Sequence, residues 1–160
     1  MEIERKYLID PGSLPFSLED YPSRLIEQGY LCTEPVVRVR RSDDAYILTY
    51  KGAGLMMREE HEFPLTAESY AHLIAKADGY IISKKRYLIP FENYTIELDV
   101  FGGNLAPLVL AEVEFPTKKE ADDFIPPDWF GQDVTCSCDY HNSTLSRTGL
   151  PAQYAGKPFC

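Results

Sequence analysis

The chain has 160 residues, of which 44% are hydrophobic and 26% are charged, and its formal net charge is -9. This composition is typical of one folded domain over residues 1–160, and the negative charge argues against broad binding to nucleic acid or to an anionic membrane. No apolar run approaches the roughly 20 residues that a membrane span needs, and no apolar signal-peptide core follows the N-terminus, so we expect a cytoplasmic protein.

The first nine residues alternate between charged and apolar side chains. Because successive side chains of a β-strand point to opposite faces, Glu2, Glu4 and Lys6 share one face. The other face is mainly apolar, with Arg5 as its one charge. Taken alone, this pattern is that of an edge strand with its polar face in water. It gains meaning because it returns along the chain.

Later segments repeat this alternation. Residues 23–31 can form a second strand, which Gly29 weakens. The further strands that we expect are residues 36–41, 46–51, 57–63, 81–89, 94–101 and 108–115. We find no internal repeat and no linker that would divide the chain.

Four helices are expected between and after these strands, over residues 14–21, 66–77, 117–124 and 139–147. Thr66 is a candidate N-cap for the second helix, and Gly79 stands where a C-terminal glycine belongs. Thr117 and Glu120 have the spacing of a capping box. The last helix should end at Gly149, before an irregular tail over residues 150–160.

The cysteine and histidine residues have no spacing typical of a metal site. Cysteines stand at positions 32, 136, 138 and 160 and histidines at positions 61, 72 and 141. The Cys-x-Cys pair is tighter than the usual zinc pair and lacks a second pair. We therefore expect reduced structural thiols and no histidine metal ligand.

The charged faces of the expected strands carry both signs. The carboxylates on them are Glu2, Glu4, Glu60, Glu62, Glu97, Asp99, Glu112 and Glu114. The cations on them are Lys6, Arg38, Arg40, Lys51, Lys84 and Arg86. These faces could point to water in an open sheet. If the sheet instead closes into a barrel of about eight strands, they line an interior wide enough for one small ligand.

A charged interior of this kind has a specific chemical meaning. Buried charges are tolerated only when they are paired or bound to metal. Carboxylates without imidazole or thiolate favour hard cations such as Mg²⁺ or Mn²⁺. Paired arginine and lysine side chains suit phosphate oxygens. The pattern therefore predicts a metal-assisted site for a small polyanion.

These residues resemble a known family. Glu2-x-Glu4-x-Lys6 is similar to the signature of the CYTH superfamily, the triphosphate tunnel metalloenzymes, in the form of a bacterial-type CYTH domain protein. The remaining matches follow in the family's order and are Arg38-x-Arg40, Lys51, Glu60-x-Glu62, Lys84-x-Arg86, Asp99 and Glu112-x-Glu114. The stretch with Tyr140-x-Asn142 resembles the C-terminal segment of the family.

The resemblance implies an α+β fold, mainly β, in which a closed antiparallel eight-stranded tunnel has helices packed outside. It implies hydrolysis of a triphosphate, inorganic triphosphate first, with Mg²⁺ or Mn²⁺ and two ions. It assigns metal binding to Glu2, Glu4, Glu60, Glu62, Asp99, Glu112 and Glu114. It assigns phosphate binding to Lys6, Arg38, Arg40, Lys51, Lys84 and Arg86. We place the catalytic groups among Lys6, Glu60, Glu62, Glu112 and Glu114, with one glutamate beside the attacking water.

Three alternatives stay open at this point. An adenylate cyclase would use the same metals to make cyclic AMP from ATP, although the sequence shows no recognisable adenine pocket. A thiamine triphosphatase could stack a flat ring on Trp129 or a tyrosine, although these aromatic residues are more often packing residues. A binding module could hold polyphosphate or a nucleotide without turnover, although binding alone needs fewer carboxylates.

Overall fold

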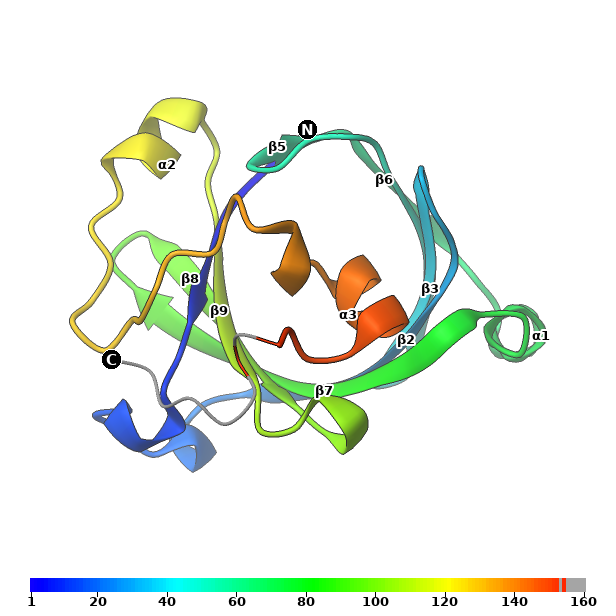
Figure 1. The fold of residues 1–160 in the computed structure, drawn as a ribbon, viewed down its shortest axis with the longest axis horizontal. Coiled ribbons are helices and arrows are strands. Elements are labelled where there is room, and N and C mark those ends of the chain that lie inside the picture. Colours follow the sequence, from blue (N-terminus) through cyan, green and yellow to red (C-terminus); the bar gives the residue numbers. More distant parts are fainter. Residues whose placement is uncertain (153, 155–160) are drawn as a thin grey trace.

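The computed structural model describes residues 1–152 and residue 154, and its strands form a ring that Figure 1 views along the axis. One sheet of nine strands has the order β5-β1-β9-β8-β7-β2-β3-β4-β6, and all neighbouring strands are antiparallel. The strands are β1 Glu2–Leu8, β2 Ser23–Thr33, β3 Val36–Ser42, β4 Ala45–Lys51, β5 Met57–Arg58, β6 Glu60–Pro64, β7 Asp78–Phe91, β8 Tyr94–Phe101 and β9 Val109–Glu114.

The ring closes through one short stretch of chain. β5 and β6 stand at opposite ends of the sheet order but are consecutive in sequence, separated only by Glu59. β5 pairs with β1 through Ile3 and Met57, and β6 pairs with β4. The expectation of eight strands was wrong by one, because the expected strand at 57–63 is divided so that its halves pair with different neighbours. Closure leaves the long strands without free edges.

Three α-helices accompany the sheet, and they are α1 Ala67–Ile74, α2 Lys118–Asp123 and α3 Asn142–Thr148. The Thr66 side chain accepts a hydrogen bond from the Ser69 amide, and the Thr117 side chain accepts one from the Glu120 amide, as N-caps do. α3 ends at Gly149, whose φ is 74°. In Figure 1, α1 and α2 lie outside the ring, whereas α3 lies within its outline.

Two expectations about helices were wrong. Residues 14–21 form no α-helix, because Pro15 and Pro22 favour extended geometry at Leu14 and Tyr21, which leaves only six residues between them. One 3₁₀ turn, Leu18–Asp20, lies in this stretch, and another, Pro11–Ser13, precedes it. Gly79 does not end α1 but belongs to the start of β7, with a φ of 68°. A side chain there would meet the Ser146 carbonyl oxygen of α3, so glycine permits this close approach.

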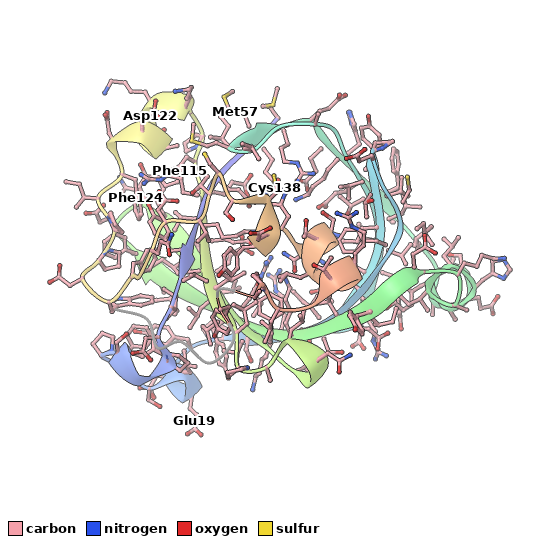
Figure 2. The ribbon with its side chains drawn as sticks, in the orientation of Figure 1. Glu19, Met57, Phe115, Asp122, Phe124 and Cys138 are labelled. Carbon is pink, nitrogen blue, oxygen red and sulfur yellow. The ribbon has the colours of Figure 1, made fainter. Side chains whose placement is uncertain are left out.

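Around β1, β8 and β9, the apolar faces of the strands are buried on the outside of the ring. Tyr7 of β1 and Phe115 after β9 pack against Phe124, which follows α2, and the two phenylalanine ring centroids are 5.1 Å apart. Figure 2 shows Phe115 and Phe124 together between the strands and α2. Trp129 packs against Phe16 and Phe130 in this outer layer. The interpretation of Trp129 as a packing residue is therefore confirmed.

The interior of the ring is charged over part of its length and apolar over the rest. On β1 the inward face runs from Glu4 and Lys6 to Leu8, and Leu8 joins a buried cluster with Leu110, Ile82 and Leu145 of α3. This cluster occupies part of the interior. No helix among residues 1–152 is long and apolar enough to cross a membrane.

Candidate active site

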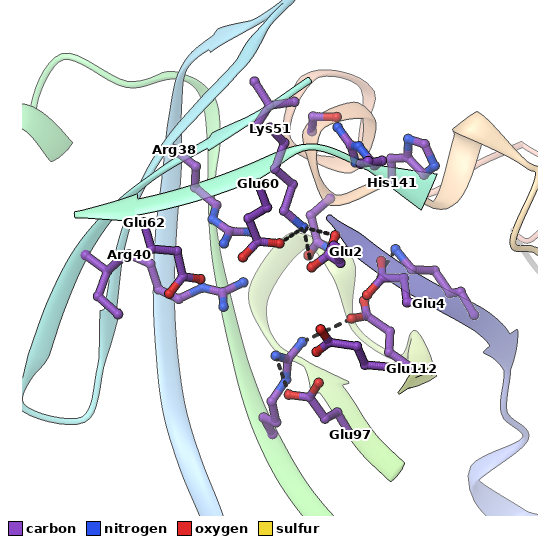
Figure 3. Close-up of a pocket in the computed structure, with 18 of the residues that line it drawn as sticks. Glu2, Glu4, Arg38, Arg40, Lys51, Glu60, Glu62, Glu97, Glu112 and His141 are labelled. Carbon is purple, nitrogen blue, oxygen red and sulfur yellow. Dashed lines mark hydrogen bonds and ion pairs between the residues drawn. The ribbon is translucent and has the colours of Figure 1, made fainter. Parts of the chain in front are cut away.

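The strand register brings the charged side chains to one interior cavity of about 240 Å³. Glu4 of β1 lies opposite Glu114 of β9, and Lys6 lies opposite Glu112. Figure 3 shows Arg38 and Arg40 on one side of the cavity and Glu4 and Glu112 on the other. The alternation that the sequence displays is therefore the alternation between cavity and outer core.

Most of the site residues expected from the sequence line this cavity. They are Glu2, Glu4, Lys6, Arg38, Arg40, Lys51, Glu60, Glu62, Arg86, Glu112 and Glu114. Glu97 lines it as well. Lys84 and Asp99 do not line it. Their side chains are fully buried, and Lys84 Nζ lies 2.7 Å from Asp99 Oδ2.

Asp99 anchors one cation of the cavity wall. Its Oδ1 accepts a hydrogen bond from Arg86 Nε at 2.7 Å, and its Oδ2 accepts one from Arg86 Nη2 at 2.8 Å. Burial alone would raise the pKa of Asp99, but Arg86 and Lys84 hold it below its usual range. Burial lowers the pKa of Lys84 to about 7, with Asp99 opposing that shift. Asp99 therefore has both oxygens engaged, and it orients the guanidinium rather than facing the cavity.

Two lysines form three further ion pairs at the cavity wall. Lys51 Nζ lies 2.9 Å from Glu2 Oε1 and 3.6 Å from Glu60 Oε2, so one ammonium serves two carboxylates. Lys6 Nζ lies 3.3 Å from Glu112 Oε1. Burial acts against ionisation of Glu112, but Lys6 and then Arg86 hold its pKa well below the usual range.

Other carboxylates are crowded without enough positive charge. Burial and then the nearby Glu112 raise the pKa of Glu4 to about 8. Burial and then a hydrogen bond with Glu60 raise the pKa of Glu2. A divalent cation beside these carboxyls would favour their charged forms and lower both pKa values.

Two buried polar atoms of the cavity wall make no hydrogen bond within the part of the chain that the structure describes. They are Arg38 Nε, which can only donate, and Glu60 Oε2, which can only accept when ionised. Arg40 pairs with no carboxylate in the described part of the chain. Burial, and then the like charges of Arg38 and Arg86, lower the pKa of Arg40 to about 9. Unpaired donors of this kind are available to an anion.

The cavity wall also holds residues that the sequence-based prediction missed. Arg58 shares the inward face with Glu60 and Glu62, and the same alternation could have identified it. Arg24 and Tyr30 line the cavity from β2, a strand that showed no paired charges in the sequence. His141 lines it from the residue before α3. Burial, and then Lys6, lowers the pKa of His141 to about 4, so this imidazole is neutral at pH 7.

The donor set fits a hard divalent cation. Glu2, Glu4 and Glu60 offer carboxylate oxygens at one cavity. A cation would lower the raised pKa values of Glu2 and Glu4 and would give Glu60 Oε2 a partner. No three carboxylate, imidazole or thiolate side chains of residues 1–152 already converge as a metal cage. The cysteines Cys32, Cys136 and Cys138 are exposed free thiols, not buried structural ones.

The sequence of the chain is similar to those of known proteins. The family model of the CYTH domain matches residues 1–135, and the chain belongs to this family. It is 38% identical over 151 residues to an inorganic triphosphatase of Nitrosomonas europaea, covering 91% of this chain and 96% of that one. It is 36% identical over 148 residues to an inorganic triphosphatase of Acetivibrio thermocellus, covering 90% and 92%.

The fold is similar to that of a solved structure. The crystal structure of the inorganic triphosphatase NE1496 superposes with a TM-score of 0.69 at 33% sequence identity. The match covers 94% of this chain and 97% of that chain. The expectation of a mainly β, barrel-shaped CYTH fold is therefore confirmed.

Proposed function

We propose that this protein hydrolyses inorganic triphosphate with the help of a divalent cation, Mg²⁺ or Mn²⁺. The observation that carries the proposal is one cavity with two complementary deficits. Arg38 is buried and Arg40 is partly buried, and neither cation pairs with a carboxylate among the residues that the structure describes. Glu2, Glu4 and Glu60 are crowded carboxylates without enough cations. A magnesium complex of a short polyphosphate supplies the missing charge of both signs.

The cations of the wall divide the work of binding. Arg38 and Arg40 have free nitrogen donors for the oxygens of a phosphoryl group. Arg86 is held by Asp99 and Glu97, at 2.7 and 2.8 Å, so its orientation is fixed before the substrate arrives. Fixed donors favour phosphoryl transfer because the reaction depends on positioning and on neutralising charge.

Glu2, Glu4, Glu60, Glu62, Glu112 and Glu114 are the carboxylates that would hold the cations, two in number by resemblance to the family. A bound divalent cation would polarise phosphate oxygens and lower the pKa of a bound water. Among these carboxylates, one from Glu60, Glu62, Glu112 or Glu114 would accept the proton of the attacking water. Lys6, 3.3 Å from Glu112, would place a proton donor and a positive charge on the same wall.

The shape of the lining favours a substrate without a large organic group. Tyr30 is the one aromatic side chain of the described lining besides His141, and Trp129 lies in the outer core. An adenine or thiamine ring therefore has few stacking partners inside the cavity. This supports inorganic triphosphate over ATP and thiamine triphosphate as the substrate.

A substrate screen tests the proposal. Phosphate release is measured with inorganic triphosphate, ATP and thiamine triphosphate, each with Mg²⁺ or Mn²⁺, and cyclic AMP is measured in the ATP reaction. We expect inorganic triphosphate to have the highest kcat/KM. Formation of cyclic AMP, or a higher kcat/KM for ATP, would reject the proposed substrate. Binding of triphosphate without phosphate release would show a binding module instead.

A further inference from the structure

Gln28 is a buried polar residue that no charge pattern in the sequence identifies. It lies in the middle of β2 with 0% of its surface exposed, and Arg40 of β3 stands directly opposite in the register. Its neighbours on the same face, Ile26 and Tyr30, are also buried. A buried amide is stable only when its donor and acceptor are both used, so its partners explain why a glutamine is there.

The Gln28 amide is a link in a chain of hydrogen bonds. Its Oε1 accepts a hydrogen bond from Arg40 Nε at 2.7 Å, and its Nε2 donates one to Asn142 Oδ1 at 3.1 Å. Asn142 Oδ1 also accepts a hydrogen bond from Lys84 Nζ at 3.2 Å. This chain joins β3, β2, α3 and β7.

The charged ends of this chain fix the orientation of both amides. An ammonium can only donate, so Asn142 presents its oxygen to Lys84, and the same oxygen faces Gln28. Gln28 must then present its NH₂ group to Asn142 and its oxygen to Arg40. The acceptor that holds Arg40 is thus set by the side chains around it.

This arrangement has a direct effect on the guanidinium of Arg40. Because Gln28 binds Nε, the two terminal nitrogens stay available at the cavity, where Figure 3 shows the Arg40 side chain entering. Arg38 and Arg86 are nearby like charges. The neutral amide holds the guanidinium against this repulsion without cancelling its charge.

We propose that Gln28 is a positioning residue that aims Arg40 at a phosphoryl group of the substrate and leaves the charge of Arg40 uncompensated. The inference rests on the proposed function, because it requires Arg40 to contact the phosphates. It explains why the position carries glutamine. A glutamate would form an ion pair with Arg40 and weaken its attraction for an anion, and an apolar residue would leave Nε without an acceptor.

Two substitutions separate orientation from charge. Gln28→Met keeps the length of the side chain and removes both hydrogen bonds. Gln28→Glu keeps the acceptor for Arg40, removes the donor to Asn142 and adds a negative charge. We expect each to raise the KM for inorganic triphosphate by roughly tenfold or more, with a smaller change in kcat. The matched control is Gln132→Glu, which adds the same charge at an exposed position of the C-terminal segment and should leave KM unchanged.

A double-mutant cycle distinguishes positioning from a purely structural role. If Gln28 acts through Arg40, the variant with Gln28→Met and Arg40→Ala should have a kcat/KM within about twofold of that of Arg40→Ala alone. A purely structural role would lower the melting temperature and make the two losses multiply. If Gln28→Met does not fold, Gln28→Glu decides, because it preserves shape and the bond to Arg40.

The outcomes separate this inference from the function on which it rests. An unchanged KM in a folded Gln28→Glu or Gln28→Met variant, while Arg40→Ala is damaging, would overturn the role of Gln28 alone. Normal turnover of triphosphate by Arg40→Ala would overturn the role of Gln28 together with the proposed phosphate-binding role of Arg40.

Discussion

Lys51 Nζ of β4 lies 2.9 Å from Glu2 Oε1 of β1, and this contact crosses the line along which the two ends of the sheet meet. The same ammonium lies 3.6 Å from Glu60 Oε2 of β6. One side chain of the cavity therefore helps to close the ring and to separate two carboxylates.

Lys51→Met should reveal this double role. The substitution leaves Glu2 and Glu60 without their cation, and breaking a buried ion pair costs roughly 3–5 kcal/mol, which lowers Tm by on the order of 10 °C. Because a divalent cation can replace the ammonium, Mg²⁺ should raise Tm more in the variant than in the wild type. Thermal melts with EDTA and with Mg²⁺ measure both effects, and an equal response to Mg²⁺ in the two proteins would contradict this account.

Arg40 and Arg41 are consecutive in β3 but point to opposite sides of the sheet. Arg40 lines the cavity, whereas Arg41 is exposed and donates a hydrogen bond to the Asp43 carbonyl oxygen. Arg40→Ala should lower kcat/KM for triphosphate by about a hundredfold or more, because the lost guanidinium no longer stabilises the negative charge of the transition state. Arg41→Ala is the matched control and should stay within about twofold of the wild type. Equal losses in both variants would mean that the faces are assigned wrongly.

The raised pKa of Glu4 predicts a pH-dependent stability for the metal-free protein. The folded state holds the proton up to a pKa of about 8, whereas the ordinary value is 4.5. As pH rises between these values, the unfolded state releases its proton first, so the free energy of unfolding falls. Glu4→Gln removes this loss. In EDTA its Tm should match that of the wild type near pH 4.5 and exceed it by about 5 °C or more at pH 8.

Magnesium supplies the control for this prediction. An ionised Glu4 gains a cation when Mg²⁺ binds, whereas a glutamine at this position offers only a neutral oxygen. The Tm advantage of Glu4→Gln at pH 8 should therefore shrink or reverse when Mg²⁺ is added. An advantage that does not change with pH would show that Glu4 is ionised in the metal-free fold.

Arg5 is expected to matter for stability and not for catalysis. It lies on the outer side of β1, where its guanidinium lies 2.6 Å from Asp133 Oδ2 and donates hydrogen bonds to the carbonyl oxygens of Ala121 and Phe124. Arg5→Ala should lower Tm by about 5 °C, because these contacts tie α2 and the C-terminal segment to β1. Its KM for triphosphate, measured well below Tm, should stay unchanged. A raised KM would place Arg5 in the substrate site.

The sequence predicted the parts of the fold that strict alternation controls. Glu2, Glu4 and Lys6 occupy every second position of one strand, and a closed sheet has only an inside and an outside, so their shared face became the cavity wall. Two helix caps were also predictable, because a cap depends on a short, fixed spacing in the sequence. Thr66 and Thr117 each accept a hydrogen bond that depends on a spacing of three residues.

The sequence did not predict features that depend on which strands become neighbours. Lys84 and Asp99 alternate correctly but do not line the cavity, because Asp99 pairs with both Lys84 and Arg86 and the pair is fully buried. The expected strand at 57–63 is divided at Glu59, because its first part pairs with β1 and its second part with β4. Gln28 gave no signal because its role depends on Arg40 across the register and on Asn142 from the far end of the chain.

The magnesium dependence of triphosphate hydrolysis tests the central claim most directly. Phosphate release from inorganic triphosphate is followed while Mg²⁺ is titrated into wild type, Glu60→Gln and the control Glu59→Gln, whose native carboxylate is exposed and pairs with His61. We expect no turnover in EDTA, a half-maximal Mg²⁺ concentration raised by about tenfold or more in Glu60→Gln, and no shift in Glu59→Gln. Full turnover in EDTA, or the same magnesium requirement in all three proteins, would contradict the claim that the cavity carboxylates hold the metal for this reaction.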